Sequence, residues 1–174
     1  MARLRRSRSY TPFERPYTRI SKFRKKSFIR ITPNIKITRF DMGGKGPFGY
    51  ELELKPKIAL QIRQEALESA RQTSLRLLEK NIAKDGFRFI VKVYPFHILR
   101  ENPIAAGAGA DRMSTGMAKP FGKPVGVAAR IREGQTVFSL SVDKGNLDVA
   151  MSALKKASKK LPCSCLITTT RHAG

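Results

Sequence analysis

The stretch QIRQEALESARQTSLRLLEKN, from Gln61 to Asn81, decides how this chain folds. Apolar and small side chains recur in it every three or four residues, in two neighbouring rows. These rows contain Leu67, Ser74, Leu78 and Ile82, and Ile62, Ala66, Ala70, Thr73 and Leu77. The spacing predicts an amphipathic helix from about Leu60 to Lys84, with Gly86 as its stop. Arg71 and most other charged residues lie off the apolar stripe, so we expect one buried face and one solvated face.

A second helical pattern occupies NLDVAMSALKKASKKL, residues 146–161, and Pro162 ends it. Around the two helices the chain alternates with a period of two, which is typical of half-buried strands. These segments span residues 35–40, 49–55, 87–94, 96–101, 125–132, 136–143 and 163–169. Residues 41–49 are expected to form a turn. The short link EGQ between 125–132 and 136–143 predicts a hairpin.

This order of elements predicts an α+β domain over residues 35–174. Each helix has one apolar face, so we expect both helices to pack on one mostly antiparallel sheet. Residues 1–34 are predicted to form a separate basic N-terminal extension, and residues 102–124 a long internal loop that protrudes from the domain.

The chain is strongly basic, with 35 Lys and Arg residues against 13 Asp and Glu, a net charge of +22. A compact molecule with this charge repels itself, so we expect a polyanionic partner. Nucleic acid is the first candidate. An anionic membrane surface is weaker, because no run approaches the ~20 apolar residues of a spanning helix. The basic N-terminus has no apolar segment behind it, as a secretory signal would, and no cleavage-like site, as a transit peptide would.

The basic charge is concentrated at the N-terminus, where residues 1–40 contain one acid, Glu14. Such a segment cannot fold alone. Aromatic residues are interleaved with the cations, which suits stacking on bases and pairing with phosphates; Tyr10, Tyr17 and Phe23 are the candidates for stacking on unpaired bases. The predicted RNA-binding residues are Arg3, Arg5, Arg6, Arg8, Tyr10, Arg15, Tyr17, Arg19, Lys22, Arg24, Lys25, Lys26 and Arg30.

The two cysteines, Cys163 and Cys165, are one residue apart on a predicted strand. A disulfide between them would close almost no loop, so we expect reduced, buried thiols. As half of a zinc site they lack a second pair, and recruitment of His97 and His172 is the less favoured alternative. We therefore predict neither a metal nor a cofactor.

The internal loop NPIAAGAGADRMSTGMAKPFGKP, residues 102–124, contains enzyme-like motifs that each fail at an identifiable point. GAGADR lacks the third glycine and the flanking strand and helix of a dinucleotide fingerprint. GMAKPFGKP is one residue too long for a phosphate-binding loop, and Pro124 replaces the hydroxyl residue. MSTG is not a nucleophile elbow. Asp111 and Glu101 are expected to cap or to pair with an arginine. No catalytic residue is predicted, and the protein is not expected to be an enzyme.

As a binding element the same loop makes better sense. Its glycines allow the backbone to approach a surface closely, and Arg112, Lys119 and Lys123 offer charge to a polyanion. Met113, Met117 and Phe121 are apolar groups that a solvated linker would not need. We therefore interpret the loop as a shape-fitting probe and the basic extension as the main electrostatic anchor. A linker with no function is the alternative.

Three segments carry a family resemblance. They are KITRFDMG (36–43), QIRQEALESARQTSLRLLEKN (61–81) and YPFHILRENPIAAGAGADRMSTGMAKPFGKPVGVAARI (94–131). They closely resemble the L-ten-e branch, archaeal and eukaryotic, of the universal L-sixteen family of large-subunit ribosomal proteins. The likeness extends from about Pro16 to the last predicted strand, while FRKKSFIRI (23–31) departs from the family pattern.

The resemblance implies an α/β-hammerhead fold and a non-catalytic, cytoplasmic protein of the large ribosomal subunit. It implies binding to large-subunit rRNA beside the A-site tRNA corridor and a loop directed towards the peptidyl-transferase centre. Neighbouring subunit proteins, A-site tRNA and late maturation factors are the further partners it implies. The loop residues that inherit this role by position are Arg100, Gly107, Gly109, Asp111, Arg112, Ser114, Gly116, Lys119, Phe121, Gly122 and Lys123.

Two readings from other classes stay open at this point. One is an RNA-processing enzyme with a basic arm, or an RNA-binding factor outside the ribosome. The other is a peripheral membrane protein.

Overall fold

The computed structural model describes residues 3–13, 23, 25, 34–105, 107–113, 116–118 and 120–171. The helices are α1 (Gln64–Asn81), the short α2 (Ala110–Met113) and α3 (Leu147–Ser158). The strands are β1 (Asp41–Gly43), β2 (Tyr50–Pro56), β3 (Leu60–Arg63), β4 (Phe87–Val91), β5 (His97–Glu101), β6 (Lys123–Ile131), β7 (Phe138–Val142) and β8 (Cys165–Arg171). Three 3-10 turns, η1 (Ser7–Tyr10), η3 (Gly116–Ala118) and η4 (Lys144–Asn146), complete the described elements.

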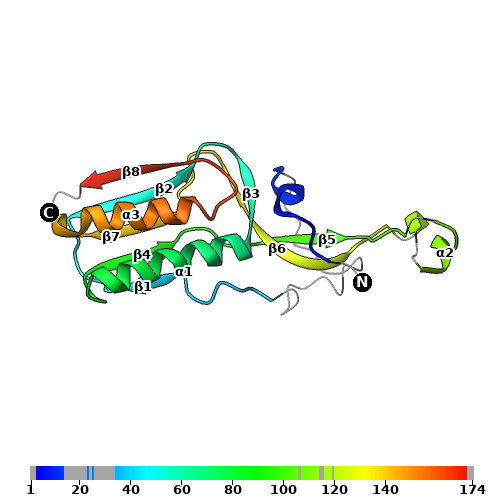
Figure 1. Ribbon diagram of the computed structural model, residues 1–174, viewed down its shortest axis with the longest axis horizontal. Coiled ribbons are helices and arrows are strands. Elements are labelled where there is room, and N and C mark those ends of the chain that lie inside the picture. The colour runs from blue at the N-terminus through cyan, green and yellow to red at the C-terminus, as the bar shows by residue number, and fades with distance from the viewer. Residues whose placement is uncertain are drawn as a thin grey trace.

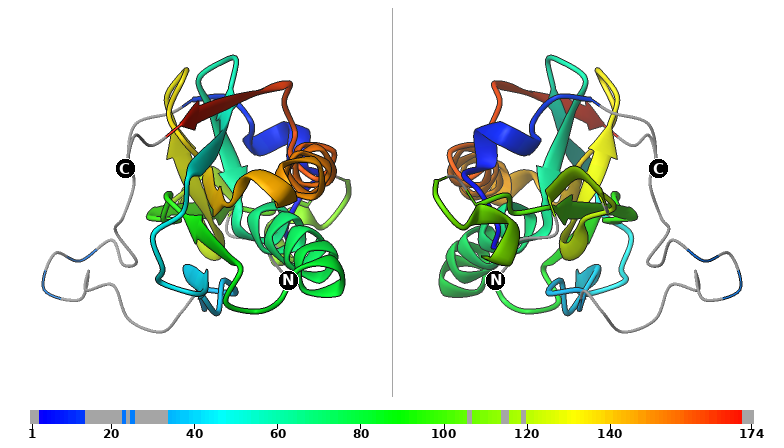
Figure 2. Two further views of the ribbon diagram at one scale, coloured as in Figure 1. Left: turned by 90° about the vertical axis from the view of Figure 1, so that its left-hand side faces the viewer. Right: turned by 90° about the vertical axis from the view of Figure 1, so that its right-hand side faces the viewer.

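The strands form two antiparallel sheets. The larger sheet has the order β1-β4-β7-β2-β8 and the smaller has the order β3-β6-β5. Helices α1 and α3 lie side by side on one face of the larger sheet, as Figures 1 and 2 show. The smaller sheet continues the long axis of the molecule, and the loop with α2 lies at its far end (Figure 1). The α+β class with two packed helices is confirmed.

One core joins the helix layer to the larger sheet. Phe87, Phe89 and Phe138 are fully buried, and the rings of Phe89 and Phe138 stack at 5.4 Å. The helices contribute fully buried residues to this core, among them Leu67, Leu78 and Leu154. Burial of each such side chain stabilises the fold by roughly 1.5–3 kcal/mol. The expected single apolar face of each helix is what makes this layer possible.

The expectation of one sheet is wrong, and the reason lies at the start of α1. Residues 60–63 are strand β3 and not the first turn of the helix, and Arg63 is extended, with φ −65° and ψ 147°. Leu60 and Ile62 would be buried whether residues 60–63 formed a helix or a strand, so the apolar pattern could not distinguish the two structures. The backbone of β3 pairs with β6, and this long-range pairing builds the second sheet.

The predicted hairpin of 125–132 with 136–143 is also wrong. Strand β6 pairs with β3 and β5, whereas β7 pairs with β2 and β4. The link between them turns the chain from one sheet to the other. Gly134 has φ +70°, and its N–H donates to the Pro56 carbonyl at 3.1 Å.

The predicted strand at 35–40 is a further error. The edge strand β1 is instead formed by Asp41–Gly43, inside the predicted turn. The side chain of Gln64 accepts a hydrogen bond from the Lys36 N–H, so this N–H is not available to pair with another strand. Arg71, expected on the solvated face, is buried, with its guanidinium 2.5 Å from Glu68 and 3.1 Å from the Met42 sulfur. Within the residues described, no helix is long and apolar enough to cross a membrane.

Candidate nucleic-acid interface

The loop is carried at the end of the smaller sheet, between β5 and β6 (Figure 1). It is shorter than predicted, because β6 already begins at Lys123. Lys123 pairs with Glu101, and Pro124 pairs with Arg100 next to a register shift. Because its two ends belong to paired strands, the loop is set on a rigid base.

The root of the loop is closed by Arg100. Its Nη1 donates to the Gly122 carbonyl at 2.8 Å, and its guanidinium lies 4.2 Å from the centre of the Phe121 ring. A Cβ at Gly122 would lie 2.7 Å from the carbonyl carbon of Glu101, so only glycine fits there. Arg100, which the resemblance implies is part of the loop near tRNA, therefore holds the root of the loop together in this structure.

Three glycines shape the tip of the loop. Gly107, Gly109 and Gly116 have φ values of +114°, +81° and +56°, the region that favours glycine. Arg112 is exposed there, and Met117 is 69% exposed. Lys123, at the other end, is exposed as well. The side chain of Asp111 and the predicted site residues Ser114 and Lys119 lie outside the described residues.

Residues 3–13 form an N-terminal strap that packs on the smaller sheet. The Gln61 N–H donates to the Thr11 carbonyl at 3.0 Å, and Gln61 Nε2 donates to the carbonyls of Pro12 and Tyr10 at 2.7 and 3.2 Å. The Tyr10 ring is buried in a small cluster with Leu99 and Ala128. The expectation that Tyr10 stacks on a base is corrected by this burial.

A hydrogen-bonded clasp joins the strap to the loop root. Glu101 Oε1 accepts from Arg5 Nε at 2.8 Å and from the Tyr10 hydroxyl at 2.5 Å. The Arg5 N–H donates to the same hydroxyl at 3.0 Å. Burial, followed by the hydrogen bond to Glu101, raises the pKa of Tyr10 above its ordinary value. The expected pairing of Glu101 with an arginine is confirmed.

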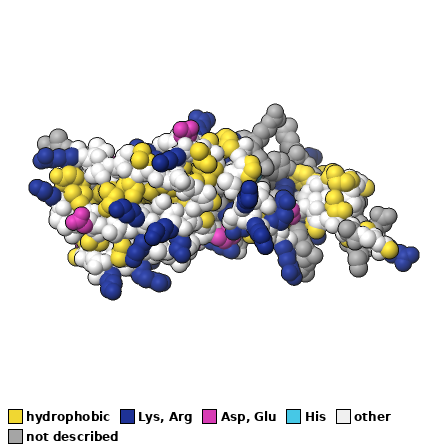
Figure 3. Space-filling model, turned by 45° about the horizontal axis from the view of Figure 1, so that its top comes forward, with side chains coloured by type: hydrophobic (Ala, Val, Ile, Leu, Met, Phe, Trp, Pro, Cys, Tyr) yellow, Lys and Arg dark blue, Asp and Glu magenta, His cyan; other side chains and the backbone are white. Residues whose placement is uncertain are grey.

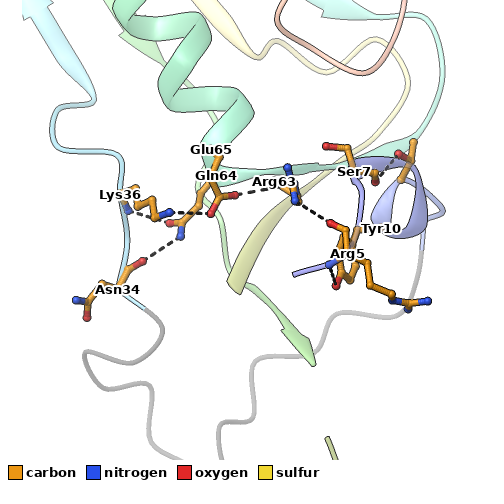
Figure 4. Close-up of polar contacts among 9 residues, drawn as sticks. Arg5, Ser7, Tyr10, Asn34, Lys36, Arg63, Gln64 and Glu65 are labelled. Carbon is orange, nitrogen blue, oxygen red and sulfur yellow. Dashed lines mark hydrogen bonds and ion pairs between the residues drawn. The ribbon is translucent and has the colours of Figure 1, made fainter. Parts of the chain in front are cut away.

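Residues 34–36, which follow the basic N-terminal segment, are bound by side chains at the start of α1 (Figure 4). Gln64 Nε2 donates to the Asn34 carbonyl at 3.0 Å, while Gln64 Oε1 accepts from the Lys36 N–H at 2.8 Å. Lys36 Nζ lies 3.2 Å from Glu65, and Arg63 Nη1 donates to the Arg5 carbonyl at 3.2 Å. Four residues within positions 61–65, namely Gln61, Arg63, Gln64 and Glu65, therefore anchor the chain before and after residues 14–33. The sequence offered no signal for this, because buried glutamines do not stand out in an amphipathic pattern.

The predicted RNA-binding cations divide into three groups. Arg3, Arg6, Arg8 and Lys25 are exposed. Arg5 is exposed as well but is paired with Glu101, and that hydrogen bond raises its pKa. The remaining predicted residues of the extension, Arg15, Tyr17, Arg19, Lys22, Arg24, Lys26 and Arg30, lie outside the described residues.

A second basic surface lies on the helix layer, where an open groove of about 520 Å³ runs beside α1. Ser69, Gln72, Thr73 and Leu77 line it together with the cations Arg76, Lys80 and Lys156. Figure 3 shows Lys and Arg side chains along most of the visible face, with few acids among them. Phosphate groups are the ligands that such a surface attracts without regard to sequence.

The thiols of Cys163 and Cys165 are free and their sulfur atoms lie 3.6 Å apart. They are half-buried, so the expectation of reduced thiols agrees with the structure and the expectation of buried thiols is corrected. The hydrogen bond between the two thiols lowers the pKa of Cys165 to about 7 and raises the pKa of Cys163. His172 lies outside the described residues, and within the described part of the chain no three His, Cys, Asp or Glu side chains gather to hold a metal ion.

The family model of ribosomal protein L16p/L10e matches residues 18–168 of this chain. The chain is 40% identical over 172 residues to the large ribosomal subunit protein uL16 of Methanococcus aeolicus, with 98% of this chain and 96% of the relative covered. It is 39% identical over 170 residues to the protein of the same name from Methanococcus maripaludis strain C7, with coverage of 97% and 95%. A match of this length and identity shows that the chain belongs to the L16p/L10e family of ribosomal proteins.

Proposed function

We propose that this protein is a structural constituent of the large ribosomal subunit, where it binds rRNA and holds its glycine-rich loop towards A-site tRNA and the peptidyl-transferase centre. The names of the relatives support the place in the large subunit. The net charge of +22 supports rRNA as the principal partner, because contacts to phosphates release counterions. In this proposal the loop helps to position tRNA and serves late subunit maturation.

The observation that carries the proposal is the loop's rigid base. Arg100 and Gly122 close its root, and the Glu101 clasp joins that root to the strap. The tip offers backbone at three glycines, the cation Arg112 and the exposed Met117. A rigid stem with a tip of this kind suits close contact with folded RNA better than a solvated linker would.

The test is to shorten the tip and leave the root intact. Replacing residues 107–118 with two glycines keeps Arg100, Phe121 and Gly122. We expect an unchanged thermal midpoint and unchanged affinity for large-subunit rRNA, but slower tRNA accommodation on reconstituted subunits. Accommodation at the wild-type rate would contradict the loop's role.

A matched variant separates anchoring from positioning. Substitution of Arg3, Arg6 and Arg8 by glutamine removes three exposed charges and leaves Arg5, Tyr10 and the clasp in place. We expect weaker rRNA binding with a shallower dependence on salt, by at most about 0.9 in the logarithmic slope for each lost phosphate contact. An unchanged slope would contradict the anchoring role of the strap. Deletion of the whole extension would be a poorer test, because it would also remove Tyr10 from its cluster.

A further inference from the structure

The segment that connects β4 to β5 carries a line of outward-facing side chains. Burial alternates along it: the residues at positions 91, 93 and 95 are buried, while Lys92, Tyr94 and Phe96 are exposed. From Val91 to Tyr94 this alternation places Lys92 and Tyr94 on the same side. The Phe96 N–H then donates to the Tyr94 carbonyl at 3.0 Å, a tight turn across Pro95 that keeps the two rings close together. One cation and two aromatic rings therefore follow one another along a single surface.

The Tyr94 ring contacts two further rings. It stacks on Phe40, with ring centres 5.3 Å apart and an interplanar angle of 23°, and the Phe96 ring lies against it at 4.6 Å, tilted by 45°. Tyr94 is 40% exposed and Phe96 is 61% exposed. Phe40 is one of the partly buried residues packed against the core, so the stack is fixed at its inner end. A phenylalanine this exposed, held on a fixed stack, presents its ring to a partner.

The charge around the rings is positive. Arg39, next to Phe40 in the chain, is exposed, as is Lys92. Two nearby carboxylates are engaged with other cations, Asp41 with Arg88 at 2.8 Å and Glu53 with Lys55 at 2.6 Å. These hydrogen bonds lower the pKa of both acids, and the charge of Lys92 adds a smaller contribution. An anion that approached the rings would meet the exposed Lys92, and these two carboxylates are already engaged with other cations.

From this arrangement we propose that Tyr94 and Phe96 form a stacking platform for an unpaired rRNA base, and that Lys92 binds an adjoining phosphate. The proposal rests on the proposed function in that RNA is the partner. A nucleotide combines a flat π-face with an anion, which is the combination this surface matches. An apolar pocket of a neighbouring protein would use the rings but not the cation Lys92.

The experiment compares substitutions at Phe96 by equilibrium binding to purified large-subunit rRNA. Phe96→Leu keeps apolar area but removes the π-face, so we expect affinity to fall about tenfold with the salt slope unchanged. Phe96→Trp should retain affinity. Ile58→Ala is the control, because Ile58 is comparably exposed, at 55%, and not aromatic; it should bind as wild type. Circular dichroism checks that each variant is folded.

The same series has a direct spectroscopic readout. The chain has no tryptophan, so Phe96→Trp introduces a single indole whose emission stacking on a base would quench. Quenching at saturating rRNA supports the platform. Unchanged emission, or wild-type affinity of Phe96→Leu, overturns the platform while rRNA binding itself stands. Loss of affinity in Phe96→Ala but not in Phe96→Leu would mean that apolar contact with the RNA suffices without a π-face, and this also overturns the platform. Failure of the wild-type chain to bind rRNA would overturn the proposed function as well.

Discussion

Glu101 lies at the junction of the strap, the smaller sheet and the loop. As the last residue of β5 it pairs across the sheet with Lys123, and its carboxylate accepts from Arg5 and Tyr10. The Tyr10 hydroxyl is the inner of these donors, because its ring is 6% exposed. The clasp therefore depends on a hydroxyl that has few alternative partners.

Tyr10→Phe tests the clasp with little change of shape. It removes the hydroxyl from Glu101 and from the Arg5 N–H, and we expect a loss of about 1 kcal/mol in the free energy of unfolding. Urea denaturation at pH 7 measures it. Ser9→Ala, at an exposed position of the same turn, is the control. Equal stability of Tyr10→Phe and wild type would mean that the hydroxyl contributes nothing.

The raised pKa of Tyr10 should make the free energy of unfolding depend on pH in the alkaline range. Its pKa in the folded state is raised above the ordinary 10.0, so the unfolded chain loses this proton first as pH rises. The contribution of Tyr10 is thus complete below pH 10 and declines as pH rises towards the folded pKa. The stability difference between wild type and Tyr10→Phe should narrow above pH 10. A constant difference would contradict the shift.

Gly122→Ala tests the loop root. The added Cβ would meet the carbonyl carbon and oxygen of Glu101 at 2.7 and 2.9 Å, so backbone must move. We expect a cost of about 1–3 kcal/mol and faster amide exchange at Arg100. Gly46→Ala has open space around the new Cβ and should be neutral. Similar effects of both substitutions would mean that the contact is easily relieved.

At the scale of the element, the start of α1 acts as an anchor as well as a helix end. Gln61 and Gln64 are each 2% exposed, and their side chains bind backbone groups of the strap and of residues 34–36. The backbone of β3 pairs with β6 in the same stretch. The transition from strand to helix at Arg63 thus fixes three parts of the chain together.

Gln64→Leu should release residues 34–36 from the start of α1. The Lys36 N–H and the Asn34 carbonyl lose their partner, and we expect a cost of about 1 kcal/mol with faster exchange of the Lys36 amide. Hydrogen exchange followed by mass spectrometry measures it. Gln72→Leu, on an exposed position of the same helix, should leave the Lys36 amide protected. Unchanged protection in Gln64→Leu would place the anchor elsewhere.

At the scale of the whole molecule, charge opposes compactness. The ion pairs within the described residues include Arg5–Glu101, Lys36–Glu65 and Arg88–Asp41, which lie at the surface, while Arg71–Glu68 is mostly buried. Even if every one of the 13 acidic residues were paired in this way, most of the 35 Lys and Arg residues would have no acidic partner. The surplus cations repel one another over a distance that salt reduces.

The isolated protein should therefore gain stability with ionic strength. We expect the thermal midpoint to rise between about 0.02 and 0.3 M potassium chloride, since the Debye length falls from over 20 Å to below 10 Å. Differential scanning calorimetry measures this, with sodium sulfate at matched ionic strength separating screening from specific anion binding. A midpoint that falls with salt would mean that surface ion pairs outweigh the repulsion.

The sequence by itself determined the α+β class, both long helices, most of the strands and the presence of an inserted loop. These features follow from local periodicity, because burial of one face imposes a period of 3.6 or 2. From Gln64 to Asn81 the apolar rows of α1 lie where the spacing predicted them, as do the residues of α3. The family could likewise be recognised from the sequence of residues 94–131.

Only the tertiary structure decided how the strands divide. Leu60 and Ile62 suit either a helix or a strand, and pairing with β6 settles the choice. Strands β6 and β7 are adjacent in the chain yet join different sheets, because their hydrogen-bonding partners are remote in sequence. In the sequence, Tyr10 is one of several aromatic residues in a basic segment. Its position beside Glu101, 91 positions away, depends on tertiary contacts that a local sequence pattern does not reveal.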